Sequence, residues 1–333
     1  MVHLADLQQL GGGMKTEIAA AQDNAVRREK RKASVRRGLF IASFIGIPIL
    51  HFLVFFVYTN ADTILLSFQT FDNMTGGYKW VGFRNYSEFF HQFVTPNTVL
   101  PKAIRNSIYF FLLNDFVILP LSFFAAFFLY KKMPLGNVFR VLFFIPSIIS
   151  VVVLTMLFSF MFDSSIGVVD SLLRAIGLER VIPDLGWFGD KRTAMPLLLL
   201  YCVWAGIGYN VVLLSGAMSR VPSEIVESGR LDGLTMFREM RSITLPLTGS
   251  TISTLLMMGV TVIFTLFMQP QLITNGGPNG ETYTIALYIV NAIRSDGNLT
   301  MGATVGILCA LVGTPIVLVV RKVLEKVFPV YEY

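Results

Sequence analysis

The sequence predicts an all-α integral membrane protein that crosses the bilayer six times. Apolar residues make up 54% of the 333-residue chain and charged residues only 14%. A soluble domain carries about 25% charged residues, so this composition is typical of a protein embedded in lipid. The second observation is the spacing of the apolar stretches, since a helix needs about 20 mostly apolar residues to cross the hydrocarbon layer.

Six stretches meet that length requirement, and polar segments separate them. They are 38–58, 107–130, 138–162, 194–218, 249–272 and 302–323. Pro48 and Pro120 fall within the first two stretches, where neighbouring helices can satisfy the carbonyl groups that a proline leaves free. We therefore expect a six-span transmembrane domain over 38–333, preceded by a polar, basic arm over 1–37.

Basic residues recur in three of the short connections as well as in the arm. They are Lys131, Lys132 and Arg140 between spans two and three, Arg220, Arg230, Arg238 and Arg241 between spans four and five, and Arg321, Lys322 and Lys326 after span six. All of these fall on one side of the membrane, which the positive-inside rule makes the cytoplasm. Both termini are expected there, with the arm against anionic lipid. The net charge of +6 therefore reports topology, not nucleic-acid binding.

The composition leaves little scope for metal or thiol chemistry. The chain has three His and two Cys residues, and Cys202 and Cys309 both lie inside apolar stretches. The phosphate-loop pattern GxxxxGK[ST] does not occur in the sequence, so we expect the chain to bind no nucleotide.

One polar segment, 221–247, interrupts the apolar sequence between the fourth and fifth spans. It reads VPSEIVESGRLDGLTMFREMRSITLPL. Pro222 can begin a helix, and Gly233 loosens the backbone before a second helix over 235–241. The segment is expected to form a helix–turn–helix across the cytoplasmic mouth of the bundle, where it would meet a soluble partner.

Two of the outer connections also carry helical patterns. Residues 163–193 are expected to form a short amphipathic helix followed by a turn that bears Trp187. The apolar run 283–293 has about 11 residues and is too short to span. It is expected at the membrane interface or packed on the bundle.

The polar segment resembles the signature loop of permease subunits in bacterial ATP-binding-cassette (ABC) importers. In that family Glu-Ala-Ala is followed three residues later by Gly, and then by Ile-x-Leu-Pro. The matching residues here are Glu227-Ser228-Gly229, Asp232-Gly233 and Ile243-Thr244-Leu245-Pro246. Ser228 and Gly229 replace the two alanines, and both are small.

Other landmarks resemble the carbohydrate-uptake branch, near the larger permease subunits of maltose-type and glycerol-phosphate-type importers. They are Val81-Gly82-Phe83-Arg84-Asn85-Tyr86, Asn106, Arg140 with Pro146, and Thr274-Asn275-Gly276-Gly277-Pro278 followed by Thr282. The resemblance covers about 38–333. It implies a six-helix type I ABC importer permease bundle with a cytoplasmic coupling helix.

The resemblance also implies partners for this chain. The coupling loop would be seated on one of two separate ATPase subunits, which would bind ATP and Mg, while this chain would hold no cofactor and catalyse no reaction. A second, homologous permease and an extracytoplasmic solute-binding protein would complete the complex in a bacterial inner membrane. The residues expected to couple the chain to the ATPase are Glu227, Ser228, Gly229, Asp232, Gly233 and Pro246.

Polar and small residues in spans three to five are the expected solute pathway. Thr261, Thr265 and Gln269 recur every four residues and so share one helical face. In maltose-type relatives the equivalent spans contact the sugar, which implies a common cavity lined by Thr155, Gly206, Tyr209, Asn210, Thr261 and Gln269. The alternative for each residue is packing between helices, where small polar residues are common. These three spans carry no mid-span charge, which favours a neutral solute such as a sugar, an oligosaccharide or a polyol.

Two other protein classes remain open on the sequence alone. A secondary, ion-coupled transporter normally shows internal repeats or ionisable residues at the membrane midplane, and neither is evident. A membrane-embedded enzyme would need converging His, Asp or Ser side chains. His51 is the one histidine within a predicted span, it has no evident acidic partner, and we expect it to form an interior hydrogen bond.

Overall fold

The computed structural model describes residue 28 and residues 30–329. The chain divides into two compact units, Met1–Thr63 and Ile64–Tyr333. Most of the predicted arm, 1–27, lies outside the described residues. Its predicted role in topology therefore stays a prediction.

The first unit contains most of one long apolar helix, Lys30–Ser67, which is 38 residues long. It includes a π-helical segment η1 (Phe52–Tyr58) and ends in α2 (Thr59–Ser67). The helix begins within the predicted arm, since 30–37 are continuous with it; the boundary of the membrane span at residue 37 stays a prediction. Its large apolar side chains are exposed. A helix that is apolar all round needs lipid or another protein around it.

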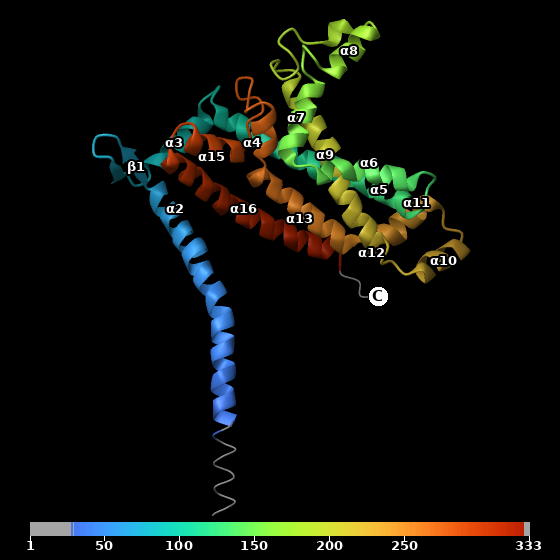
Figure 1. Ribbon diagram of the computed structural model, residues 1–333, viewed down its shortest axis with the longest axis horizontal. Coiled ribbons are helices and arrows are strands. Elements are labelled where there is room, and N and C mark those ends of the chain that lie inside the picture. Colours follow the sequence, from blue (N-terminus) through green and yellow to red (C-terminus); the bar gives the residue numbers. More distant parts are fainter. Residues whose placement is uncertain (1–27, 29, 330–333) are drawn as a thin grey trace, which may run out of the picture. The chain divides into compact units, whose positions relative to one another are not determined.

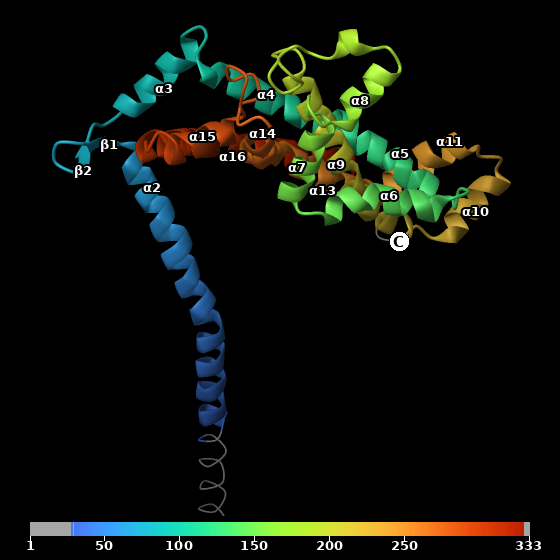
Figure 2. The ribbon, with the colours of Figure 1, turned by 45° about the horizontal axis from the view of Figure 1, so that its top comes forward.

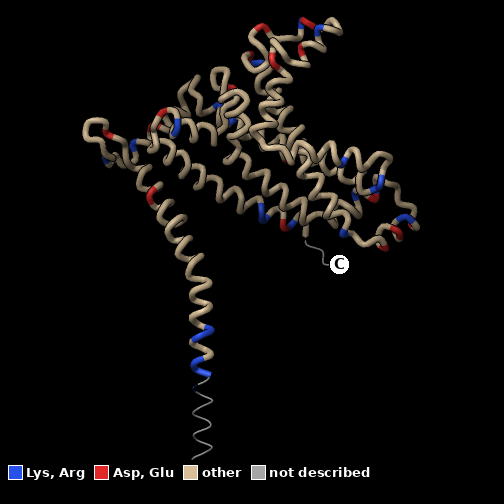
Figure 3. Tube along the Cα trace, in the orientation of Figure 1, with Lys and Arg blue, Asp and Glu red and all other residues tan. Residues whose placement is uncertain are grey.

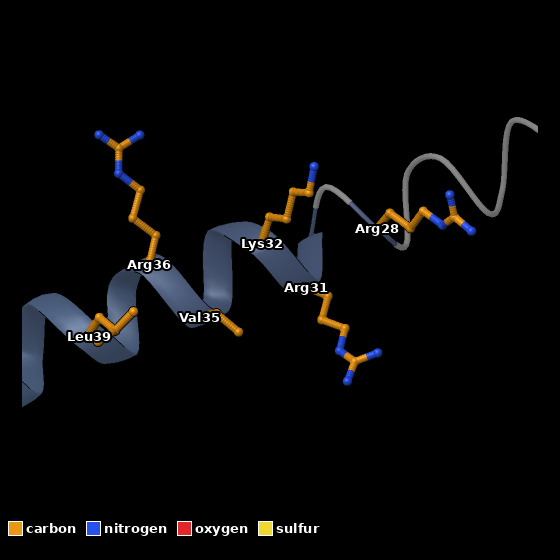
Figure 4. A pocket seen from close by; sticks show the side chains of 6 residues that line it. All are labelled: Arg28, Arg31, Lys32, Val35, Arg36 and Leu39. Carbon is orange, nitrogen blue, oxygen red and sulfur yellow. The ribbon is translucent and has the colours of Figure 1, made fainter.

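The start of this helix is strongly basic. A hollow of about 430 Å³ on its surface is lined by Arg28, Arg31, Lys32, Val35, Arg36 and Leu39, all from successive turns of the one helix (Figure 4). Arg36 and Lys32 extend from one side of the helix and Arg31 from the other. The hollow is thus the space between side chains of a single helix, and we assign no ligand to it.

The second unit is helical apart from one short hairpin (Figures 1 and 2). The hairpin pairs β1 (Gln69–Asp72) with β2 (Gly77–Trp80) in antiparallel register. The helical elements before the polar loop are α3 (Arg84–Val94), α4 (Val99–Leu113), η2 (Asn114–Ile118), α5 (Leu119–Tyr130), α6 (Gly136–Ile148), α7 (Val151–Met161), α8 (Val168–Ala175), η3 (Glu179–Val181) and α9 (Ala194–Met218). Those from the loop onward are α10 (Ser223–Leu231), α11 (Met236–Glu239), η4 (Met240–Thr244), α12 (Leu245–Leu247), α13 (Gly249–Thr265), α14 (Met268–Ile273), α15 (Ile285–Arg294) and α16 (Leu299–Val327).

The apolar stretches form four continuous helices and two bent pairs. The continuous helices are Lys30–Ser67, Val99–Tyr130, Ala194–Met218 and Leu299–Val327. Counting each bent pair as one span gives up to six spans in the described part of the chain.

Two of the predicted spans are therefore not single helices. The stretch 138–162 consists of α6 and α7, which meet at 107° because Ile149 and Ser150 have extended backbones. The stretch 249–272 breaks after Thr265, and α14 begins at Met268. On its other side, α13 meets the helix Met236–Leu247 at 73°.

Two π-helical segments explain how prolines sit inside helices without breaking them. η2 lies just before Pro120, and η4 lies just before Pro246. A proline clashes with the carbonyl group four residues earlier, here that of Phe116 or Ser242. Both carbonyls belong to π turns, whose wider ring leaves more room. The helix Val99–Tyr130 therefore runs unbroken through Pro120.

The core of this unit lies where α5, α9 and α13 pack together. Its buried members include Phe127, Leu214 and Ile252, one from each helix. A second apolar cluster joins α3, α4, α15 and α16. The short apolar run 283–293 thus packs on the bundle through α15, one of the two arrangements that its length allowed.

Candidate functional site

The polar loop forms a helix–turn–helix at one end of the second unit, beside the ends of α5 and α6 (Figures 1 and 2). α10 ends at Leu231, and two residues later Gly233 has a φ of +76°, which favours glycine. The amide of Leu234 donates to the Gly229 carbonyl and that of Gly233 to the Arg230 carbonyl, both at 3.0 Å. This pair of bonds is a Schellman cap, which satisfies carbonyl groups at the end of the helix. The turn is at the predicted position, and the second helix is longer than predicted, extending to Leu247.

The loop has a small apolar core of its own. Val221, Val226 and Ile243 are buried together, with Leu234 and Leu247 packed against them. Charged residues gather on this loop, whereas most of α9, α13 and α16 carries none (Figure 3). The core holds the charged surface in a defined shape.

The residues expected to couple to an ATPase divide into two groups. Glu227, Ser228, Asp232 and Gly233 are exposed. Gly229 is buried, and a Cβ atom there would lie 2.7 Å from Leu234 Cδ1. The missing side chain of Gly229 thus lets α10 pack on its own loop, and its role in coupling stays a prediction. Pro246 is half-buried in α12.

The structure adds apolar residues to this surface that the sequence analysis left out. Leu231 is 89% exposed at the end of α10, and Ile225, Met236 and Phe237 are also exposed. Their signal was present in the sequence, as large apolar side chains in a segment that is otherwise polar. Leu231 is the most exposed of the four, whereas Phe237 lines a cavity together with residues of α5.

A cavity of about 190 Å³ lies between α4–η2, α9 and α13–α14. It is lined by Phe110, Leu113, Asn114, Ile118, Tyr201, Cys202, Ala205, Gly206, Val262, Leu266 and Gln269. Two of the predicted pathway residues, Gly206 and Gln269, meet here. A Cβ at Gly206 would lie 3.3 Å from Ile118 Cδ1, so this glycine lets α9 approach η2 closely.

The other predicted pathway residues do not line this cavity. Thr155 is buried, and its hydroxyl donates to the carbonyls of Val151 and Val152 in its own helix. Asn210 is also buried. Tyr209 is 49% exposed, and Thr261 is exposed with its hydroxyl bonded to its own helix.

Asp115 is an intramembrane carboxyl group that the sequence analysis overlooked. It lies within the predicted second span, is 6% exposed, and accepts a 3.0 Å hydrogen bond from Asn114 Nδ2. Gly259 of α13 makes room for it, since a Cβ there would lie 1.6 Å from Asp115 Oδ1. The prediction that no ionisable residue lies mid-span is wrong for this helix. Such residues are costly in lipid and often mark a functional path.

A family model described as "Binding-protein-dependent transport system inner membrane component" matches residues 118–328, well over half of the chain. The chain belongs to this family. The permease is therefore a multi-pass inner-membrane protein of a transport family, not of an enzyme family.

Relatives of the permease carry related descriptions. It is 25% identical over 296 residues to the diacetylchitobiose uptake system permease protein NgcF of Streptomyces coelicolor, covering 86% of this chain and 82% of the relative. It is 26% identical over 276 residues to the arabinooligosaccharides transport system permease protein AraP of Bacillus subtilis, covering 82% and 83%.

A solved structure shares the fold of the permease. It is a bacterial alginate ABC transporter in complex with an alginate pentasaccharide-bound periplasmic protein. The TM-score is 0.77 at 19% identity, over 90% of this chain and 98% of that one. The prediction of an all-α, type I ABC importer permease is confirmed, and a secondary transporter is not supported.

Residues that carry the resemblance hold the turn 274–284, called the outer turn after its predicted side of the membrane, against the bundle. Asn106 Nδ2 of α4 donates to the carbonyls of Glu281, at 2.7 Å, and Tyr283, at 2.9 Å. The hydroxyls of Thr274 and Thr282 are 2.6 Å apart. These bonds fix the segment that follows α14. Gln269, which lines the cavity, lies in α14 itself.

His51 is exposed on the first helix, where its ring lies 4.7 Å from that of Phe55, so the expected interior position is wrong. In the part of the chain that the structure describes, no group of three or more His, Cys, Asp or Glu side chains could hold a metal ion.

Proposed function

We propose that this permease forms one half of the pathway for a sugar, an oligosaccharide or a related polyol, and that its 221–247 loop couples the pathway to separate ATPase subunits. The observation that carries the proposal is the solvent-exposed face of α10. It presents the carboxylates of Glu227 and Asp232 beside Leu231, which is almost fully exposed. Burying a leucine side chain contributes about 1.5–3 kcal/mol, so this face favours a protein partner.

The solute class is supported by two kinds of observation. The relatives are described as permeases for diacetylchitobiose and for arabinooligosaccharides, and the solved structure as an alginate transporter. In this chain the cavity offers amide groups from Asn114 and Gln269. Amides can donate hydrogen bonds to sugar hydroxyls and accept hydrogen bonds from them.

The pathway needs a second, homologous permease. Tyr209 and Thr261 are exposed on this chain, and they are the residues that such a partner would enclose. The proposed complex also contains two ATPase subunits that bind ATP and Mg, and an extracytoplasmic solute-binding protein. The family description and the periplasmic protein in the related structure support the binding protein.

The proposed orientation places both termini in the cytoplasm, because the basic connections share that side. The basic side chains at the start of the first helix would then contact anionic lipid headgroups (Figure 4).

The proposal is tested by Leu231→Asp in a complex of this chain with its neighbouring permease, ATPase and binding protein. Because Leu231 is exposed, the chain should fold normally, whereas the new charge would be buried against the ATPase. We expect co-purification of the ATPase to fall at least tenfold, with loss of the ATP hydrolysis that loaded binding protein stimulates.

The matched control is Met74→Asp, which places the same charge on an exposed apolar residue in the hairpin turn. It should leave ATPase binding unchanged. If Leu231→Asp also leaves ATPase binding and hydrolysis unchanged, α10 is not the docking surface.

A further inference from the structure

A buried carboxylate joins the loop to a helix far away in the sequence. Glu239 of α11 is 3% exposed. One of its oxygens pairs with Nζ of Lys131, the residue that follows α5, and the other lies 3.8 Å from Nε of Arg230 in α10. A single side chain thus connects α5 with both helices of the loop.

Lys131 is held in place by more than this ion pair. Its Nζ lies 5.6 Å from the ring centre of Phe127 and 5.7 Å from that of Tyr130, which allows cation–π attraction. Its side chain is only 14% exposed. Salt screens a buried pair weakly, and removing one partner of such a pair leaves an uncompensated charge. The connection should therefore persist when the loop moves.

α5 leads directly from this ion pair to the cavity. The helix Val99–Tyr130 is continuous, and Asn114 in its middle lines the cavity. At 1.5 Å per residue, Asn114 lies roughly 25 Å along the helix from Lys131. The chain itself joins the loop to α9 and α13, and Met240 of the loop packs in the apolar core beside α5. The ion pair adds a polar contact to this packing, at the end of α5.

We propose that Glu239 is a positioning residue that fastens the loop to α5, so that a displacement of α10 also moves the helix that carries Asn114 and Asp115. This inference rests on the proposed docking of the loop to an ATPase. It assigns the ion pair a role in coupling ATP hydrolysis to solute movement, beyond holding the loop in shape.

The test measures solute transported per ATP hydrolysed in proteoliposomes that contain the whole complex. Glu239→Gln and Lys131→Met each remove one charge; the first keeps the length of the side chain, and the second keeps an unbranched apolar stem one atom shorter. We expect each to lower the number of solute molecules moved per ATP at least fivefold, in complexes that still bind the ATPase. Because the two residues act through one contact, the double variant should be no worse than the worse single variant.

The control is Glu325→Gln, which breaks the exposed Arg321–Glu325 pair on α16 and should leave the ratio unchanged. The charge-reversed variant Lys131→Glu with Glu239→Lys should recover part of the ratio, because it restores an ion pair between the same two positions. If Glu239→Gln fails to assemble, Lys131→Met makes the same test from α5.

Two results would overturn the inference: an unchanged ratio in both single variants, or losses that multiply in the double variant. Failure of the docking proposal is recognised separately, because Leu231→Asp would then retain its bound ATPase.

Discussion

Two glycines of α9 differ in whether a side chain would fit at their position. A Cβ at Gly208 of α9 would lie 2.0 Å from the carbonyl oxygen of Phe143 in α6. At Gly216, in the same helix, a Cβ would have no heavy atom within 4 Å. Gly208 is therefore needed for the contact between α6 and α9, and Gly216 is not.

Gly208→Ala should lower the free energy of unfolding of the permease by about 1–3 kcal/mol. The atom that the new Cβ would meet is the Phe143 carbonyl oxygen, and a backbone atom cannot move aside as a side chain can. The measurement is the temperature at which Cys202 and Cys309, the two thiols of the chain, react with a thiol reagent in detergent. We expect that temperature to fall.

Gly216→Ala serves as the matched control. Alanine favours a helix interior over glycine by about 1 kcal/mol, so this variant should be neutral or slightly stabilising. Equal effects of the two substitutions would show that helix propensity, not the contact with Phe143, governs both sites.

At the scale of elements, the outer turn is fastened to α4 by a few buried polar groups. Thr282 and Thr284 are fully buried, and the hydroxyl of Thr284 donates to the carbonyl of Leu266, just before α14. Lys102 of α4 pairs with Glu281 at 2.7 Å. The position of α14, and with it Gln269, therefore depends on these bonds.

Asn106→Ala should loosen this turn, because it leaves the carbonyls of Glu281 and Tyr283 without their donor. An unsatisfied buried polar group costs about 1–3 kcal/mol. We expect faster amide hydrogen exchange over 274–284 and slower solute uptake by the complex. Asn73→Ala, at an exposed asparagine, is the control. Unchanged exchange in Asn106→Ala would mean that other contacts hold the turn.

At the scale of the whole molecule, the proposed pathway is lined on one side by this permease. The small cavity collects polar groups from three separate regions of the chain. A larger cavity of about 470 Å³ has Asp115 and Arg241 in its lining. The adjacent residues Asn114 and Asp115 thus line different cavities, which places the η2 turn between the two.

Gln269→Leu should lower solute uptake at least tenfold while the unstimulated ATPase rate and assembly stay unchanged, because it removes an amide from the cavity without altering the loop. Uptake of a labelled oligosaccharide into proteoliposomes, with ATP hydrolysis measured in parallel, checks this.

The comparison variant for Gln269→Leu is Thr155→Val, which was also predicted from the sequence to lie on the pathway. Its hydroxyl is bonded to its own helix, so we expect uptake within about twofold of the wild type. The opposite ranking of the two variants would place the pathway beside α7 instead of η2.

The sequence by itself determined the membrane environment, the six apolar stretches, the family and the position of the polar loop with its turn at Gly233. These depend on the composition and order of neighbouring residues, which can be read locally. Asp115 could also have been found this way, as a charge inside an apolar stretch.

Only the tertiary structure decided which of the candidate residues meet. The 107° bend between α6 and α7, the burial of Gly229 and the seat of Asp115 against Gly259 depend on the residues packed opposite each of them. The pair Lys131–Glu239 joins residues 108 positions apart. No local pattern marks such a pair, because the pair exists only once separate helices have packed together.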